Sequence, residues 1–153
     1  MFKRFDDYYA TIQRQAFFTI FEKSAHDKIV DGAVTDDISG VYRSTLNEQF
    51  NGSVDVAKEF DFEWALIPHI YHSPFYCYSY SFGNLLALAM FQRYKEEGTA
   101  FAKDYEAILA AGGSQNPQKL LEKHGIDISS SKSWDSGFDY IKQQLHMLKK
   151  HNV

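Results

Sequence analysis

The residues best suited to chemistry gather in one tract, IPHIYHSPFYCYSYSFGNLLALAM, which runs from Ile67 to Met90. The tract holds four tyrosines and two histidines, and it has no Asp, Glu, Lys or Arg. A tyrosine has an unperturbed pKa of about 10, so at pH 7 it is a neutral donor that suits a substrate carbonyl or a developing oxyanion. A buried phenol without a partner costs about 1–3 kcal/mol, and phenylalanine would fill the same space more cheaply. The number of tyrosines suggests that their hydroxyls are used, but spacing alone leaves open an aromatic core helix whose hydroxyls reach the surface.

Motifs for a metal site or an activated nucleophile are absent from the sequence. A helical zinc site needs H-E-x-x-H, and none of the six histidines is followed by glutamate. His69 and His72 are three residues apart, but no carboxylate lies near them in the sequence. Cys77 lies among aromatic residues with no base at helical spacing, which indicates a buried structural thiol. We expect no metal ligands within this chain.

The elements that must position the tract are predicted to be helical nearly throughout, because apolar residues recur at i+3 and i+4. We expect about seven helices and no strand pair. The predicted ranges are 4–28, 36–50, a short turn at 62–66, 74–97, 100–110, 117–124 and 134–150. Thr35, Ser73, Thr99 and Asn116 are the predicted N-caps of their helices. His69 and Tyr71 are expected in a loop that precedes the helix starting at Pro74.

Length and charge limit the class of protein. The 153 residues predict one helical domain over 1–153, and a net charge of −4 argues against a general affinity for nucleic acid or anionic membranes. The uncharged tract contains two histidines and two prolines, so we expect no membrane span there. One cysteine, Cys77, excludes an intrachain disulfide and fits a cytoplasmic location.

The pattern I-P-H-x-Y-x-x-P-F-Y-x-Y-x-Y, from Ile67 to Tyr80, resembles the C-terminal signature of oligoendopeptidase F, a member of the thimet-oligopeptidase-like zinc peptidases. The segments TIQRQAFFTIFEKSAH, SFGNLLALAMFQRYKEEG, AAGGSQNPQKLLEKHGIDI and SWDSGFDYIKQQL also resemble that family. The resemblance covers essentially the whole chain, in order. It implies an all-α fold, the C-terminal helical lobe of a zincin-like, neurolysin-type oligopeptidase.

The resemblance also implies what the chain lacks. In the family, H-E-x-x-H and a further zinc-binding glutamate lie upstream of the part matched here. We therefore expect no cofactor in this chain, zinc in the complete family enzyme, and no activity for this chain alone.

Carried over by position, the family implies a role for each residue of the tract. His69 and Tyr78 would hydrogen-bond the scissile carbonyl oxygen as it becomes a tetrahedral oxyanion. Tyr71 and Tyr76 would contact the peptide backbone, with His69 also binding substrate, and Tyr80 would support them. Spacing alone leaves open whether Tyr76 or Tyr78 is the main donor.

The implied partners are short peptides, together with a zinc-bearing N-terminal lobe or a second copy of the chain that covers exposed apolar surface. The alternative function is that of a stand-alone helical peptide-binding or scaffold protein without catalysis. Peptide binding near His69 would favour the first function over the second.

Overall fold

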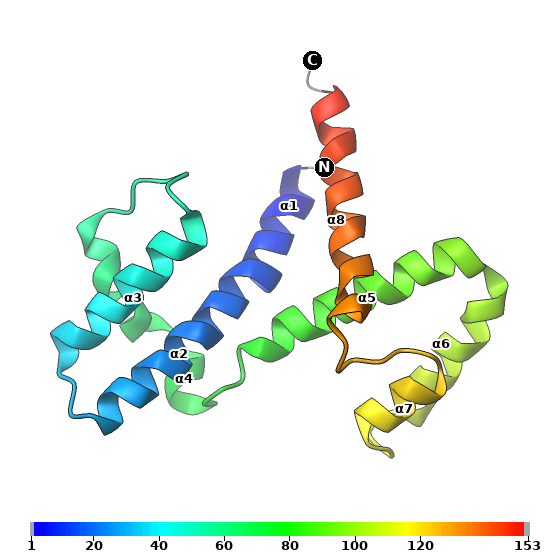
Figure 1. Cartoon of the computed structure of the whole chain (residues 1–153), viewed down its shortest axis with the longest axis horizontal. Coiled ribbons are helices and arrows are strands. Elements are labelled where there is room, and N and C mark those ends of the chain that lie inside the picture. The colour runs from blue at the N-terminus through cyan, green and yellow to red at the C-terminus, as the bar shows by residue number, and fades with distance from the viewer. Residues whose placement is uncertain (1, 152–153) are drawn as a thin grey trace. The chain divides into compact units, whose positions relative to one another are not determined.

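The computed structural model describes residues 2–151, and every regular element in that range is helical (Figure 1). In chain order the elements are α1 (Phe2–Tyr8), the π-helical segment η1 (Tyr9–Gln13), α2 (Arg14–Val30), α3 (Thr35–Phe50), the 3₁₀ segment η2 (Lys58–Leu66), α4 (Pro68–His72), α5 (Tyr78–Glu97), α6 (Thr99–Ala111), α7 (Pro117–Lys123) and α8 (Ser131–His151). The predicted all-α fold is confirmed. In the described range, no helix has the length and apolar character needed to cross a membrane.

The chain divides into two compact units, Met1–Phe82 and Gly83–Val153, and each has its own buried cluster. Helix α5 begins in the first unit and continues into the second. The predicted single domain over residues 1–153 stays a prediction.

The core of the first unit is built from α2 and α3, which run side by side in Figure 1. The ring of Phe21 meets the ring of Tyr42 edge-on, with centroids 4.8 Å apart, and both side chains are almost fully buried. The other buried apolar members of this core are Phe18, Ala25, Ile38, Leu46, Ile67 and Cys77. Of the apolar rows that i+4 spacing predicts, Phe21 and Ala25 lie in this core, whereas Ile20 is 47% exposed. The buried Phe18 belongs to neither predicted row.

A π-helical turn interrupts the long N-terminal helix that the sequence predicts over 4–28. It spans Tyr9–Gln13, so α1, η1 and α2 follow one another without a loop. The Ser81 hydroxyl donates a hydrogen bond of 2.7 Å to the Ile12 carbonyl, and the side-chain amide of Gln13 donates one of 2.9 Å to the backbone carbonyl of Gln49. Single π-helical turns within longer helices are rare and leave no signal in an apolar pattern.

Helix α3 begins one residue earlier than its predicted cap implies. Val34 is the extended residue at the N-cap position, and Thr35 is already helical. The Asp37 carboxylate accepts a hydrogen bond of 2.9 Å from the Val34 amide, which satisfies one of the free N–H groups at the helix start. The predicted Thr35 cap is therefore wrong, but the acidic first turn on which it was based does stabilise the helix.

The start of α5 also differs from the sequence-based expectation. Ser73 and Pro74 do not begin a helix; α5 starts at Tyr78, after a turn in which Phe75 has φ +59°. A residue in the left-handed region cannot continue a right-handed helix, so the predicted start at Pro74 is wrong. His69 and Tyr71 lie in the short helix α4, which the sequence analysis expects to be a loop.

The second unit packs α5, α6 and α7 around a small apolar cluster. Its buried members are Met90, Phe101, Leu121 and Ile126. Helix α8 crosses α5 at Gly137, where a Cβ atom would lie 2.8 Å from the Leu85 carbonyl oxygen, so only glycine permits this close approach (Figure 1). The predicted Asn116 cap is confirmed, because its side chain accepts a hydrogen bond from the Lys119 amide. The predicted Thr99 cap is wrong, because Gly98 is the N-cap residue of α6 and Thr99 is already helical.

Candidate functional site

Three of the predicted site residues form one cluster, which we call the His69 cluster: His69 from α4, Tyr76 from the turn and Tyr80 from α5. His69 Nε2 lies 2.9 Å from the Tyr80 hydroxyl, within hydrogen-bonding distance. The His69 and Tyr76 rings are stacked, with centroids 6.1 Å apart, and the Tyr76 and Tyr80 rings meet edge-on at 5.5 Å. Tyr76 and Tyr80 are 49% and 36% exposed, so the cluster faces solvent rather than filling a sealed core.

The other two tyrosines of the tract stand outside this cluster. Tyr71 is 51% exposed and Tyr78 is 56% exposed. Among the described residues, neither hydroxyl has a hydrogen-bond partner, so both can serve a ligand. Partial burial raises the pKa of Tyr71, which keeps its phenol a neutral donor at pH 7.

The turn that carries Tyr76 is fastened to α2 by a residue that the sequence analysis does not single out. Glu22 is fully buried, and its Oε1 accepts a hydrogen bond of 2.7 Å from the Phe75 amide. The Phe75 ring packs against His26, with centroids 4.8 Å apart. The available signal was a glutamate beside Phe21 within the apolar face of the long N-terminal helix.

The cysteine in this turn is a buried free thiol. Cys77 is 1% exposed and belongs to the core of the first unit. Burial, and secondarily the charge of Glu22, raise the pKa of the Cys77 thiol. A nucleophilic cysteine needs a lowered pKa and an accessible sulfur, so the expectation of a structural thiol agrees with this geometry.

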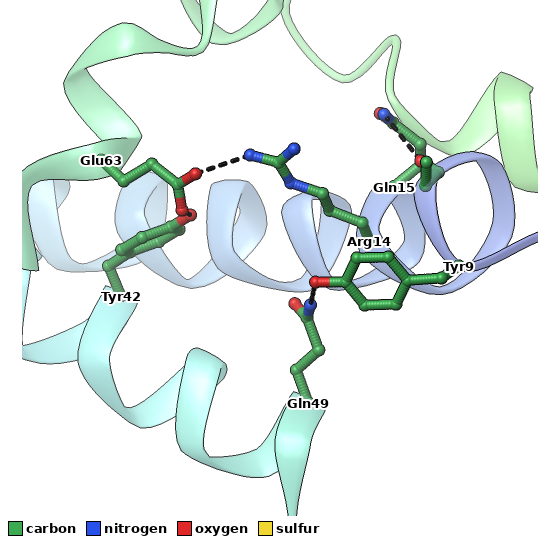
Figure 2. A network of polar contacts seen from close by, with 7 residues as sticks. Tyr9, Arg14, Gln15, Tyr42, Gln49 and Glu63 are labelled. Carbon is green, nitrogen blue, oxygen red and sulfur yellow. Dashed lines mark hydrogen bonds and ion pairs between the residues drawn. The ribbon is translucent and has the colours of Figure 1, made fainter. Parts of the chain in front are cut away.

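A second set of polar contacts involves residues of η1, α2, α3 and η2 in the first unit (Figure 2). Glu63 from η2 binds the Arg14 guanidinium through Oε1 and accepts the Tyr42 hydroxyl through Oε2, both at 2.6 Å. Nearby, the Gln49 amide donates to the Tyr9 hydroxyl at 2.8 Å. Burial, and then the bond to Glu63, raise the pKa of Tyr42, so its phenol remains a donor.

This network borders a shallow cavity of about 250 Å³. Its polar groups already bind one another: Arg14 pairs with Glu63, and Tyr9 with Gln49. Sequence patterns give no sign of this network, because Arg14 and Glu63 are 49 residues apart. The network holds η2 against α2 and α3.

The second unit contains a larger apolar cavity of about 480 Å³. It is lined by Ala87, Met90, Phe91, Tyr94, Phe101, Ala102, Tyr105 and Glu106. None of these residues belongs to the predicted site.

The next feature is the placement of side chains that could bind a metal ion. Nowhere in the range 2–151 do three or more His, Cys, Asp or Glu side chains come together in a group that could hold a metal ion. The described residues therefore do not fit the zinc that the family resemblance implies for a complete enzyme.

Comparison with known proteins supports the resemblance along nearly the whole chain. The model of peptidase family M3 matches residues 2–140. Plasmid oligoendopeptidase F of Lactococcus lactis subsp. cremoris is 29% identical over 147 residues, which are 95% of this chain and 24% of that protein. Oligopeptidase PepF of Bacillus subtilis strain 168 is 30% identical over 137 residues, which are 88% of this chain and 20% of that protein.

The fold gives the same result. The crystal structure of a proposed peptidase from Chlamydophila abortus matches with a TM-score of 0.88 and 27% identity, over 97% of this chain and 25% of that one. The chain spans about a quarter of the length of the relatives it matches. On the family match over residues 2–140 and the agreement in fold, this chain belongs to peptidase family M3.

Proposed function

We propose that this chain is the substrate-binding lobe of a zinc-dependent oligopeptidase that hydrolyses short peptides. The observation that carries the proposal is the His69 cluster, together with the exposed phenols of Tyr71 and Tyr78 on the same stretch of chain, which have no hydrogen-bond partner among the described residues. The family membership and the relatives named oligoendopeptidase and oligopeptidase support a peptidase context.

The proposed chemistry is donation of hydrogen bonds to a peptide carbonyl. The His69 ring is held through Nε2 by the Tyr80 hydroxyl. When Tyr80 donates this hydrogen bond, the neutral ring carries its proton on Nδ1, which can then donate to a carbonyl oxygen. Tyr78 supplies a second donor to the same oxygen, and a pair of fixed donors stabilises the charge that develops on it.

The remaining tyrosines have positioning roles in this proposal. Tyr71 and Tyr76 contact the peptide backbone, and Tyr80 supports His69. The stack of Tyr76 on His69 favours the proposal that Tyr76 orients the imidazole while Tyr78 is the main oxyanion donor. Donors to the backbone rather than to side chains would make peptide binding tolerant of sequence.

A partner follows from the same proposal. The chain alone is inactive, and a zinc-bearing N-terminal lobe or a second copy covers part of its apolar surface. Large apolar side chains are exposed in each unit, Leu66 at 81% in the first and Leu109 at 61% in the second. The buried free thiol of Cys77 accords with a cytoplasmic location, which remains part of the proposal.

Titration with a short labelled peptide tests the binding function. We expect a fluorescein-labelled nonapeptide to bind the full chain, with similar affinity for a scrambled sequence, as measured by fluorescence anisotropy. His69→Ala should weaken binding by about tenfold, the loss typical of one good hydrogen bond. Tyr105→Phe, which removes an exposed phenol in the second unit, is the matched control and should leave the affinity unchanged.

The opposite outcome would be equally clear. If neither peptide binds at millimolar concentration to a chain that circular dichroism shows to be helical, the alternative of a scaffold protein is favoured. Equal losses for His69→Ala and Tyr105→Phe would remove the His69 cluster from the proposal.

A further inference from the structure

Glu22 is a buried carboxylate of α2, although the packing of this helix does not require a carboxylate there. It lies at 0% exposure next to Phe21, and Phe18 lies one turn before it. Its Oε1 accepts the Phe75 amide, whereas its Oε2 is buried and, among the described residues, has no hydrogen-bond partner. A carboxylate buried with one oxygen unsatisfied is costly, and an apolar residue would suit this face better. The side chain therefore has a use in the turn that it contacts.

That turn has a backbone conformation that its own residue opposes. Phe75 has φ +59°, in the left-handed region that bulky residues rarely adopt. Its ring is 47% exposed, so burial of the side chain contributes little to holding the conformation. The charge-assisted hydrogen bond from the Phe75 amide to Glu22 is the interaction that opposes the intrinsic preference.

The direction of the following residues depends on this conformation. Tyr76 comes directly after Phe75 and stacks on His69, and Tyr78 is the first residue of α5. The Tyr76 amide donates to the Ser73 carbonyl at 3.1 Å, closing the turn around Phe75. A change of φ at Phe75 would reorient both tyrosines relative to α4.

We propose that Glu22 is a positioning residue for the peptide site: from the core of α2 it holds the Phe75 amide, keeps the 73–77 turn in its left-handed conformation and so fixes Tyr76 against His69. The assignment of this site to peptide binding rests on the proposed function above. The claim that Glu22 holds the turn does not rest on the proposed function. The conformation of the turn and the binding of peptide are therefore measured separately.

The first measurement is of structure. In the full chain, Glu22→Ala should accelerate hydrogen exchange of the Phe75 amide by about tenfold or more, since the amide loses its acceptor. The same variant should lose the ring-to-ring nuclear Overhauser effects between His69 and Tyr76. Glu22→Gln retains an oxygen acceptor without the charge, and we expect a smaller change in the same direction.

The second measurement is a rescue experiment. Glycine adopts positive φ without strain, so Phe75→Gly should lessen the dependence of the turn on Glu22. We expect Glu22→Ala to weaken binding of the labelled nonapeptide by about tenfold in the parent chain, the loss expected for one charge-assisted hydrogen bond. In a Phe75→Gly background the same substitution should have a clearly smaller effect. The Phe75→Gly chain and the Phe75→Gly chain that also carries Glu22→Ala both lose the ring contact between Phe75 and His26. This loss therefore cancels when their affinities are compared.

Glu63→Gln is the matched control, because it neutralises another carboxylate of the first unit that binds Tyr42 and Arg14 instead of the turn. It should lower stability but leave hydrogen exchange of the Phe75 amide and peptide affinity unchanged.

The proposal is overturned if Glu22→Ala and Glu22→Gln, both folded by circular dichroism, keep parental hydrogen exchange of the Phe75 amide and the His69–Tyr76 contacts. It is also overturned if Glu63→Gln produces the same changes. If Glu22→Ala does not fold, Glu22→Gln alone decides by the same two readouts. Absence of peptide binding in the parent chain would instead overturn the proposed function.

Discussion

Glu63 joins two helices through its two oxygens: Oε1 binds the Arg14 guanidinium of α2 and Oε2 accepts the Tyr42 hydroxyl of α3, each at 2.6 Å (Figure 2). Tyr42 is 1% exposed, and its only route to a satisfied hydroxyl in the described structure is this carboxylate. One residue of η2 therefore connects the 3₁₀ segment to both helices of the core. Removal of the Glu63 carboxylate should therefore lower the stability of the fold rather than cause only a local change.

We predict that Glu63→Ala lowers the free energy of unfolding by about 2–3 kcal/mol, because a hydrogen bond to a charged group is worth about 1.5–3 kcal/mol and a buried phenol is left unpaired. The free energy would be measured by urea denaturation followed by circular dichroism. Glu59→Ala, an exposed glutamate of the same segment, is the control and should change stability by less than about 0.5 kcal/mol. Similar losses for both variants would contradict the prediction.

A second prediction concerns the crossing of α8 over α5. At Gly137 a Cβ atom would lie 2.8 Å from the Leu85 carbonyl oxygen, a backbone atom that cannot move aside easily. Gly137→Ala should therefore destabilise the chain by about 1–3 kcal/mol through overpacking, in spite of alanine's higher helix propensity. Thermal denaturation would give the shift of the midpoint.

Gly83→Ala provides the matched control within α5. Nothing lies within 4 Å of a Cβ atom at Gly83, and its φ is helical. The same substitution there should stabilise by about 0.5–1 kcal/mol, since only helix propensity changes. If both variants shift the midpoint in the same direction, the close contact at Gly137 does not control the crossing.

A third prediction concerns pH. Burial, and then the charge of Glu22, raise the pKa of Cys77 in the folded chain. Between the unfolded value of about 8.5 and the raised folded value, the folded chain holds a proton that the unfolded chain has lost. Stability is therefore complete below pH 8.5 and falls as pH rises, by at most about 1.4 kcal/mol per pH unit for one proton.

The measurement compares urea denaturation at pH 7.5 and pH 9.5 for the parent chain and for Cys77→Ala. The parent should lose more stability over this interval than the variant does. Tyrosines and lysines titrate in both chains, so their contribution cancels in the difference. Equal losses in the two chains would show that the thiol does not titrate differently on folding.

The sequence predicts the helices well, because their apolar faces repeat at i+3 and i+4 and several ends carry glycine or a capping side chain. Asn116 is such a case, and its cap is present. The sequence could not predict the π-turn at Tyr9–Gln13 or the left-handed backbone of Phe75. Both depend on contacts between distant segments: Ser81 with Ile12, and Glu22 with Phe75.

The family resemblance proposes which residues make up the candidate site, but it does not give their arrangement. The family resemblance names His69, Tyr71, Tyr76, Tyr78 and Tyr80, and the structure places all five on one short stretch from α4 to the first turn of α5. Which of them meet depends on the 73–77 turn, and the expected helix start at Pro74 gave the wrong backbone there. The buried Glu22 that holds this turn could be noticed only as a charge on an apolar face.

The last prediction separates Tyr78 from its neighbours by catalysis. When the chain is combined with a separately produced zinc-bearing lobe of an M3 relative, we expect hydrolysis of a short fluorogenic peptide. Tyr78→Phe should then lower kcat by about 10²–10³, the loss typical of one oxyanion donor, and leave KM nearly unchanged. Tyr76→Phe should lower kcat much less, because its ring still stacks on His69.

Tyr105→Phe is the control for this comparison, since it removes a phenol that is similarly exposed but lies in the second unit. It should keep full activity. Full activity of Tyr78→Phe, in a combination where His69→Ala is impaired, would show that Tyr78 is not the oxyanion donor. A large kcat loss in Tyr76→Phe instead would transfer that role to Tyr76, because removal of its hydroxyl leaves the aromatic stack in place and takes away only the donor.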